Sequence, residues 1–283
     1  MKEWFVWEKS ASAKWEPEWR ERLGIDAARL VLHHRPGSPV IRMEVYCSTA
    51  KEVAALIEQF GGRDATQRIE RRNARFAPVE DKQLVIGRSF TVRILAEDPP
   101  PDQIASSKEL WIRPARAFGT GEHATTRMCL EMLHQMAQPL PAGGWQMLDL
   151  GSGSGILALA ARKFGARAAE GVDYDEFATK AARANGRLNR LRQVRFQTAE
   201  LGAFEPHLTP PVECVAANLF SEVLISHLPR MRQWLKPGGH LIVSGILREQ
   251  AAGVEKAGER AGFEWQQQKN RGKWMAMQAW LPN

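Results

Sequence analysis

The chain has 283 residues, 44% of them hydrophobic and 25% charged, and a formal net charge of +7 at pH 7, as is ordinary for a globular protein of one or two domains. Residues 1–30 are too charged for a secretory signal peptide, and no apolar run reaches about 18 residues, so we expect a cytoplasmic protein with no membrane partner. The positive charge is spread along the chain without a polybasic tract, so the sequence does not require direct nucleic-acid binding.

The part of the chain before residue 97 is predicted to form a small α+β unit. Its periodicity indicates a strand, then an amphipathic helix with Thr49 as a candidate N-cap, then two further strands. These elements are expected at residues 41–47, 49–60, 63–70 and 85–95. Upstream of them, Trp15 and Trp19 are one helical turn apart, which favours a buried helical stripe; a partner-binding surface is the alternative.

The clearest linker is the acidic, proline-rich stretch at 97–106. It divides the chain into a smaller domain over 1–96, a candidate substrate-recognition domain, and a larger domain over 107–283. A chain of this length can hold both.

The larger domain alternates strands and helices, which predicts a Rossmann-like α/β fold: a parallel sheet with helices on both faces. The last segment has no room for a helix, so it is expected to form an antiparallel hairpin at the sheet edge, with a turn at 270–272. The predicted strands are 145–150, 168–173, 193–198, 212–217 and 240–246, the helices 125–137, 154–164, 175–188, 221–235 and 248–261, and the hairpin 263–281.

The most informative motif is a glycine-rich turn after the first of these strands. Asp149 ends the strand, and Gly151 and Gly153 follow before the helix begins. A second acid, Asp173, ends the next strand about 20 residues on, where a carboxylate can bind ribose hydroxyls. A dinucleotide turn reads G-x-G-x-x-G, whereas this one reads G-x-G-x-G with an acid two positions before it. That acid suits a cofactor bearing an ammonium and a sulfonium, so S-adenosyl-L-methionine is favoured over a dinucleotide.

The layout of the predicted sheet agrees with this cofactor. Five parallel strands followed by a terminal hairpin are the layout of the adenosylmethionine-dependent methyltransferase sheet. A nicotinamide-binding sheet has no need of that hairpin.

Residues 114–126 read PARAFGTGEHATT, a strand ends in Ala217-Asn218-Leu219, and another runs into Ser244-Gly245-Ile246-Leu247. With the glycine turn, these motifs resemble the ribosomal protein L-11 methyltransferase family over about 107–283. The resemblance implies an adenosylmethionine-dependent protein methyltransferase. Its acceptors would be lysine side chains and an N-terminal amine of a large-subunit ribosomal protein, with L-11 as the favoured substrate.

The resemblance also implies site residues. Cofactor contacts fall on Thr126, Gly151, Asp173 and Asn218, joined from the local motif by Asp149 and Gly153. Asn218 and the backbone carbonyl of Leu219 would orient the target amine. Phe118 would cover the cofactor or the lysine stem. His123 is a candidate base, although a structural hydrogen bond is favoured because the proton can leave to water.

No metal site is expected. The histidines lack companions at ligand spacing, and the cysteines, Cys47, Cys129 and Cys214, are widely separated. Methyl transfer is an in-line displacement that needs a neutral amine, and most of its rate would come from positioning two reactants.

A methyltransferase of the same family that acts on another protein is one alternative, and three further functions stay open. Nucleic-acid amine methyltransferases resemble N-P-P-[YF] after the fourth strand, where this chain reads N-L-F-S. A small-molecule methyltransferase would not need the leading domain. A catalytically silent adenosylmethionine-binding protein is disfavoured by the intact glycines and acids.

Overall fold

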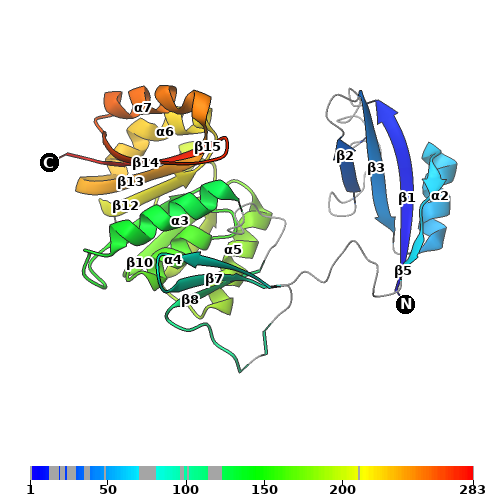
Figure 1. Ribbon diagram of the computed structural model, residues 1–283, viewed down its shortest axis with the longest axis horizontal. Coiled ribbons are helices and arrows are strands. Elements are labelled where there is room, and N and C mark those ends of the chain that lie inside the picture. Colours follow the sequence, from blue (N-terminus) through cyan, green and yellow to red (C-terminus); the bar gives the residue numbers. More distant parts are fainter. Residues whose placement is uncertain are drawn as a thin grey trace. The chain divides into compact units, whose positions relative to one another are not determined.

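The computed structural model describes residues 2–12, 19, 23, 30–34, 39–47, 49–69, 81–95, 99–100, 102–113, 123–209 and 211–282. The chain divides into two compact units, Met1–Pro78 and Val79–Asn283 (Figure 1). This division comes earlier in the chain than the linker that the sequence predicts at 97–106.

The N-terminal unit is an antiparallel sheet in the order β2-β3-β1-β4, with β5 paired to the start of β1. Helix α2 (Ala50–Phe60) packs on this sheet, and its Thr49 side chain accepts a hydrogen bond from Glu52 N, as the sequence predicts. Trp7 is fully buried in the core between sheet and helix. The strands are β1 (Lys2–Ser12), β2 (Leu30–His34), β3 (Val40–Cys47), β4 (Arg63–Asp64) and β5 (Gln67–Ile69).

The tryptophans of the N-terminal unit are only partly described. Trp19 packs edge-on against Phe60 at 6.2 Å between ring centroids. Trp15 lies outside the described residues. Trp7 belongs to a strand that sequence periodicity missed.

A three-stranded sheet opens the larger unit: β6 (Lys82–Ile86), β7 (Phe90–Ile94) and β8 (Glu109–Ile112). The single strand predicted at 85–95 is instead a tight β6–β7 hairpin, in which Gly87 takes a positive φ of 60°. The apolar side chains of these strands share one core with α3 and α4. This shared core is why the division into units falls before β6 and not after β7.

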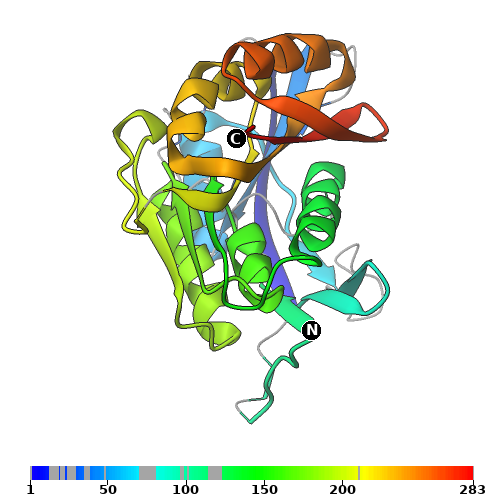
Figure 2. The ribbon, with the colours of Figure 1, turned by 90° about the vertical axis from the view of Figure 1, so that its left-hand side faces the viewer.

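The main sheet has the strand order β11-β10-β9-β12-β13-β15-β14. The first five strands are parallel, and β14 and β15 form the predicted antiparallel hairpin at the edge, drawn in red in Figure 2. The strands are β9 (Gln146–Leu150), β10 (Ala168–Asp173), β11 (Val194–Thr198), β12 (Val212–Asn218), β13 (Leu235–Leu247), β14 (Glu264–Arg271) and β15 (Trp274–Trp280).

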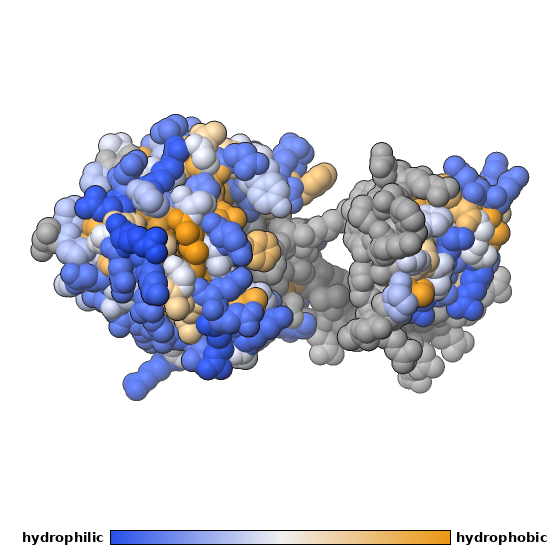
Figure 3. Space-filling model, turned by 90° about the horizontal axis from the view of Figure 1, so that it is seen from above, coloured by the Kyte–Doolittle hydropathy of each residue, from blue (hydrophilic) through white to orange (hydrophobic). Residues whose placement is uncertain are grey.

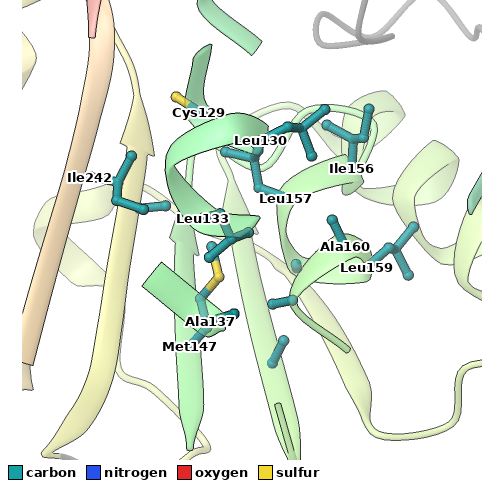
Figure 4. Packing of buried hydrophobic residues seen from close by; sticks show 14 of the residues in the cluster. Cys129, Leu130, Leu133, Ala137, Met147, Ile156, Leu157, Leu159, Ala160 and Ile242 are labelled. Atoms are coloured by element: carbon teal, nitrogen blue, oxygen red, sulfur yellow. The ribbon is translucent and has the colours of Figure 1, made fainter. Parts of the chain in front are cut away.

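Helices cover both faces of this sheet, as predicted. Apolar residues of α3, α4 and α5 share one core cluster, and those of α6 and α7 share the other. In Figure 4, Leu130 and Leu133 of α3 lie beside Leu157 of α4 and Met147 of β9. The helices are α3 (Ala124–Ala137), α4 (Ile156–Lys163), α5 (Glu176–Leu188), α6 (Ser221–Trp234) and α7 (Ala251–Arg260).

Strand β13 begins earlier than predicted. Val212 pairs with Leu235 and Cys214 with His240, so residues 236–239 bulge out of the ladder. These residues include the Pro-Gly-Gly run that the sequence places before the strand. The run therefore interrupts the pairing inside β13 rather than preceding it.

Asn185 of α5 and Asn189, the C-cap residue of that helix, hydrogen-bond to the main chain of β8 and of the residue that follows it. Asn189 Oδ1 accepts from Trp111 N at 2.9 Å, and its Nδ2 donates to Trp111 O at 2.6 Å. One turn earlier, Asn185 Oδ1 accepts from Arg113 N at 3.0 Å, while its Nδ2 donates to Ser154 O at 3.0 Å. Asn185 thus joins the end of β8 to the turn that precedes α4.

We expect Asn189→Ala to destabilise the larger unit by about 2–4 kcal/mol, because it leaves the buried N–H and C=O of Trp111 without partners. Urea unfolding measures the effect. The exposed Arg187→Ala on the same helix is the control and should change the free energy of unfolding by less than about 0.5 kcal/mol. Equal effects of the two substitutions would contradict this role for Asn189.

Candidate functional site

A cavity of about 760 Å³ opens at the carboxyl ends of the central strands. β10 lies on one side of β9 and β12 on the other, so the cavity occupies the point where the strand order reverses, the usual ligand site of such sheets. The lining residues come from the ends of β10, β12 and β13, from the segments that follow β9 to β12, from α5 and α6, from the start of α3 and from β15. They are His123, Thr125, Gly151, Gly153, Val172, Asp173, Tyr174, Asp175, Ala178, Ala199, Glu200, Leu201, Gly202, Asn218, Leu219, Phe220, Val223, His227, Gly245 and Trp274.

The glycine turn forms the floor on the β9 side. Gly151 and Gly153 have positive φ values of 70° and 52°, which favour glycine. A Cβ on Gly151 would also overlap the Cδ2 atom of Leu219. Position 151 therefore requires glycine for two reasons: its positive φ and the close approach of the Leu219 side chain.

Asp173 is held by two main-chain donors at the end of β10. Its Oδ2 accepts from Gly153 N at 2.8 Å and its Oδ1 from Asp175 N at 3.0 Å. These bonds fix the carboxylate at the cavity wall and link it to the glycine turn. Its position agrees with the carboxylate expected there.

Asp149 does not line the cavity, although the sequence predicts that it faces the cofactor. It is 1% exposed and accepts a hydrogen bond from Ala158 N, in the first turn of α4, at 3.1 Å. Burial raises the pKa of its carboxyl group to about 7, and the charge of Asp173 adds to the rise. The side chain points into the layer between sheet and helix because β9 is buried on both faces.

Asn218 connects the end of β12 to the first turn of α3. Its Nδ2 donates to Thr125 Oγ1 at 3.2 Å and to Thr126 Oγ1 at 3.4 Å. Its Oδ1 is buried and has no hydrogen-bond partner among the described residues. A neutral acceptor is therefore left unused on a residue that lines the cavity.

Both adjacent threonines are buried, but Thr125 belongs to the cavity lining, whereas Thr126, the expected cofactor contact, does not. Sequence reasoning missed Thr125. Its only signal was a second hydroxyl next to the motif threonine.

His123 is the N-cap of α3. Its Nδ1 lies 2.7 Å from Thr125 Oγ1, and its ring packs edge-on against Trp274 at 5.0 Å between centroids. These contacts agree with the structural hydrogen bond favoured for His123. Trp274 itself lines the cavity and was not singled out from the sequence.

Leu219 is tightly enclosed. Its N–H donates to Ser244 O at 3.0 Å, and a Cβ on Gly245 would overlap the carbonyl oxygen of Leu219. That carbonyl is therefore fixed beside Asn218. Phe118, the remaining predicted residue, lies outside the described residues.

The cavity wall is acidic although the chain is basic. Asp173, Asp175 and Glu200 line it, and no lysine or arginine does so within the described ranges. The chain as a whole has a formal charge of +7. Such a wall favours a cationic ligand.

Other features of the described residues are less specific. A second hollow of about 580 Å³ lies between α6 and α7 and holds none of the predicted site residues. Figure 3 shows one face of the larger unit, mostly hydrophilic with hydrophobic residues gathered near its middle. No group of three or more His, Cys, Asp or Glu is placed to hold a metal ion in the described part of the chain. Within the same residues, no helix has both the length and the apolar character needed to cross a bilayer.

Comparison with known proteins identifies related sequences. Residues 50–281 match the family model described as ribosomal protein L11 methyltransferase (PrmA). A ribosomal protein L11 methyltransferase of Pelobacter propionicus is 40% identical over 205 residues, which cover 69% of this chain and 62% of that protein. The protein of the same name from Thermus thermophilus is 40% identical over 168 residues, covering 59% and 63%. The chain thus spans about three fifths of the length of these relatives.

Solved structures give the same picture. A crystal structure of ribosomal protein L11 methylase from Lactobacillus delbrueckii subsp. bulgaricus aligns with a TM-score of 0.60 at 26% identity, covering 71% of this chain and 99% of that one. A methyltransferase from Pyrococcus furiosus, 18% identical, aligns with a TM-score of 0.50, covering 61% and 89%. The second likeness concerns the fold alone.

The raised pKa of Asp149 predicts a pH dependence of stability. In the unfolded chain this carboxyl titrates near pH 4, and in the folded chain at about pH 7. Between these values the folded state binds more protons, so the free energy of unfolding falls as pH rises, by up to about 4 kcal/mol in total. Asp149→Asn should remove this fall.

The measurement is urea unfolding of both proteins from pH 4.5 to pH 7.5 without cofactor. The unfolding free energy of the variant minus that of the wild type should grow with pH. Taking this difference removes the contribution of the other carboxyl groups, which both proteins share. A constant difference across this range would contradict the assignment.

Proposed function

The chain belongs to the ribosomal protein L11 methyltransferase family, and on this premise we propose that it transfers methyl groups from S-adenosyl-L-methionine to amino groups of ribosomal protein L11. The acceptors are lysine side chains and an N-terminal amine. The observation that carries the proposal is the unused acceptor, Asn218 Oδ1, at an acidic cavity beside the glycine turn.

The cavity fits this cofactor by charge and by shape. Asp173 would bind the ribose hydroxyls, and the methionine chain would pass close to the backbone of Gly151 and Gly153, which both line the cavity. Thr125 and Thr126 lie at the N-terminus of α3, where N–H groups favour a carboxylate. The acidic wall complements the ammonium and the sulfonium. When bound, the cofactor supplies an electrophilic methyl group.

Asn218 and Leu219 provide what the acceptor amine needs. Asn218 Oδ1 and the Leu219 carbonyl are neutral acceptors, fixed by Thr125 on one side and by Ser244 on the other. Each can take one N–H of a neutral amine, which leaves the lone pair free to point at the methyl group. A lysine has an ordinary pKa of about 10.4, so desolvation in the cavity has to favour the neutral amine.

His123 supports this arrangement indirectly. Its Nδ1 is engaged with Thr125, so we assign it the placement of Thr125 and α3. The proton that the amine loses then goes to water.

The test is an assay of the full chain with cofactor carrying a labelled methyl group and ribosomal protein L11 from the same cell. We expect label in L11, and mass spectrometry should place it on lysine side chains or the N-terminal amine. Label found only in other proteins, or in nucleic acid, would refute the proposed substrate.

Two variants separate the roles in that assay. Asn218→Ala should lower kcat at least about a hundredfold and leave the Kd for the cofactor within about threefold, because it acts on the transition state. Asp173→Ala should raise that Kd by about tenfold or more, since each charge-assisted hydrogen bond contributes about 1.5–3 kcal/mol. Calorimetry gives both Kd values, and the reverse pattern would contradict the assignments.

The N-terminal unit is our candidate for substrate recognition. Residues 1–78 form a compact unit with its own core, and the described residues that line the cavity all belong to the larger unit. The sequence assigned this role to residues 1–96, but residues 79–96 precede or belong to strands that pack with the larger unit.

A chain of residues 79–283 should keep cofactor affinity and lose at least about tenfold in kcat/KM for L11, because contacts remote from the reacting centre would be removed. Circular dichroism checks that it is folded. If the shortened chain matches the full chain on L11, the N-terminal unit does not recognise the substrate.

A further inference from the structure

Phe220 is a large aromatic side chain left in solvent at the cavity. It is 72% exposed, it is the N-cap residue of α6, and it follows Asn218 and Leu219 directly. It lines the cavity together with both of them. Burying a phenylalanine ring away from water is favourable in free energy, so an exposed ring beside the acceptor atoms is available to a ligand.

Two other aromatic side chains are about as exposed, but neither lies beside the acceptor atoms of the cavity. Tyr174, 75% exposed, follows Asp173 and therefore belongs to the cofactor side of the cavity. Phe177, 70% exposed, does not line the cavity, and the ammonium of Lys180 lies 5.7 Å from its ring centroid. Phe220 has no cation and no second ring against it among the described residues.

The acceptor side of the cavity combines two neutral hydrogen-bond acceptors, Asn218 Oδ1 and the Leu219 carbonyl, with carbon surface. Asn218 Oδ1 is the buried acceptor without a partner there, and Phe220, Val223 and Trp274 contribute carbon surface. A lysine amine loses one N–H with each methyl group that it gains. Each step therefore weakens the polar contacts of the amine, whereas contact with aromatic carbon grows. Quaternary ammonium groups are attracted to aromatic faces.

We propose that Phe220 determines product specificity: its ring packs on the stem of the acceptor lysine and then on the methylated nitrogen, so that one amine is methylated repeatedly. This inference rests on the proposed function. In each round the nitrogen forms a bond to the methyl carbon, the S–C bond breaks, and S-adenosylhomocysteine leaves. The ammonium product loses a proton to water before the next round, and the third transfer gives a permanent cation.

The first test compares Phe220→Leu and Phe220→Ala with Phe177→Ala as the matched control. Mass spectrometry follows mono-, di- and trimethylated lysine in L11 over time at saturating cofactor. In both Phe220 variants the ratio of mono- plus dimethylated to trimethylated product should rise at least about threefold. Phe177→Ala should give the wild-type ratio. An unchanged ratio in Phe220→Ala, with wild-type cofactor affinity and melting temperature, would overturn the inference while the proposed function stands.

The second test needs no turnover. Calorimetry measures binding of free Nε-trimethyllysine and of free lysine to the full chain saturated with S-adenosylhomocysteine. Wild type should prefer trimethyllysine, and Phe220→Leu should weaken trimethyllysine about three- to tenfold while lysine changes less than twofold. Equal weakening of both, or none, overturns the inference. A wild type that methylates no L11 refutes the proposed function, and this titration still decides the role of Phe220.

Discussion

The cavity depends on the packing of Leu219 between two glycines. Its side chain lies against Gly151 at the end of β9, and its backbone lies against Gly245 in β13. Because β12 is hydrogen-bonded to both strands, these two close approaches fix the end of β12 from both sides. The position of Asn218 follows, since it precedes Leu219 and is tied through Nδ2 to the threonines of α3. Three strands and one helix are thereby held around one neutral acceptor atom.

The two aspartates next to the glycine turn show how different surroundings give similar carboxyl groups different properties. Asp173 accepts two main-chain N–H groups at the cavity wall, which suits an ionised carboxylate that is open to a ligand. Asp149 has one such donor among the described residues and is buried, and burial raises the pKa of its carboxyl group to about 7. The Asp149 side chain binds the first turn of α4, and its contribution to the free energy of unfolding becomes less favourable as pH rises. The charge that a cationic ligand meets at the wall comes from Asp173, Asp175 and Glu200.

Much of the larger unit could be predicted because its signals are local. Buried strands, amphipathic helices and a final hairpin are encoded within short windows, and the glycine turn identifies the reversal point of the sheet. The division near residue 78 could not be predicted, because β6 and β7 join the larger unit through contacts with the distant helices α3 and α4. The direction of the Asp149 side chain could not be predicted either. A strand that is buried on both faces has no alternation of polar and apolar residues that would show which face the ligand contacts. Thr125 and Thr126 differ only in helical phase, which depends on His123 as the N-cap.

The asparagines of α5 have a consequence for how the chain behaves in a crowded solution. β8 is the outer strand of its three-stranded sheet, and such edges offer main-chain groups on which a strand from another molecule can grow. Asn185 and Asn189 occupy the outward N–H groups of Arg113 and Trp111 and the outward carbonyl of Trp111. The side-chain amides of the two asparagines make the hydrogen bonds that a fourth strand would make, and they offer no further strand edge. A newly made chain is therefore protected from sheet-to-sheet association at this edge as soon as α5 docks.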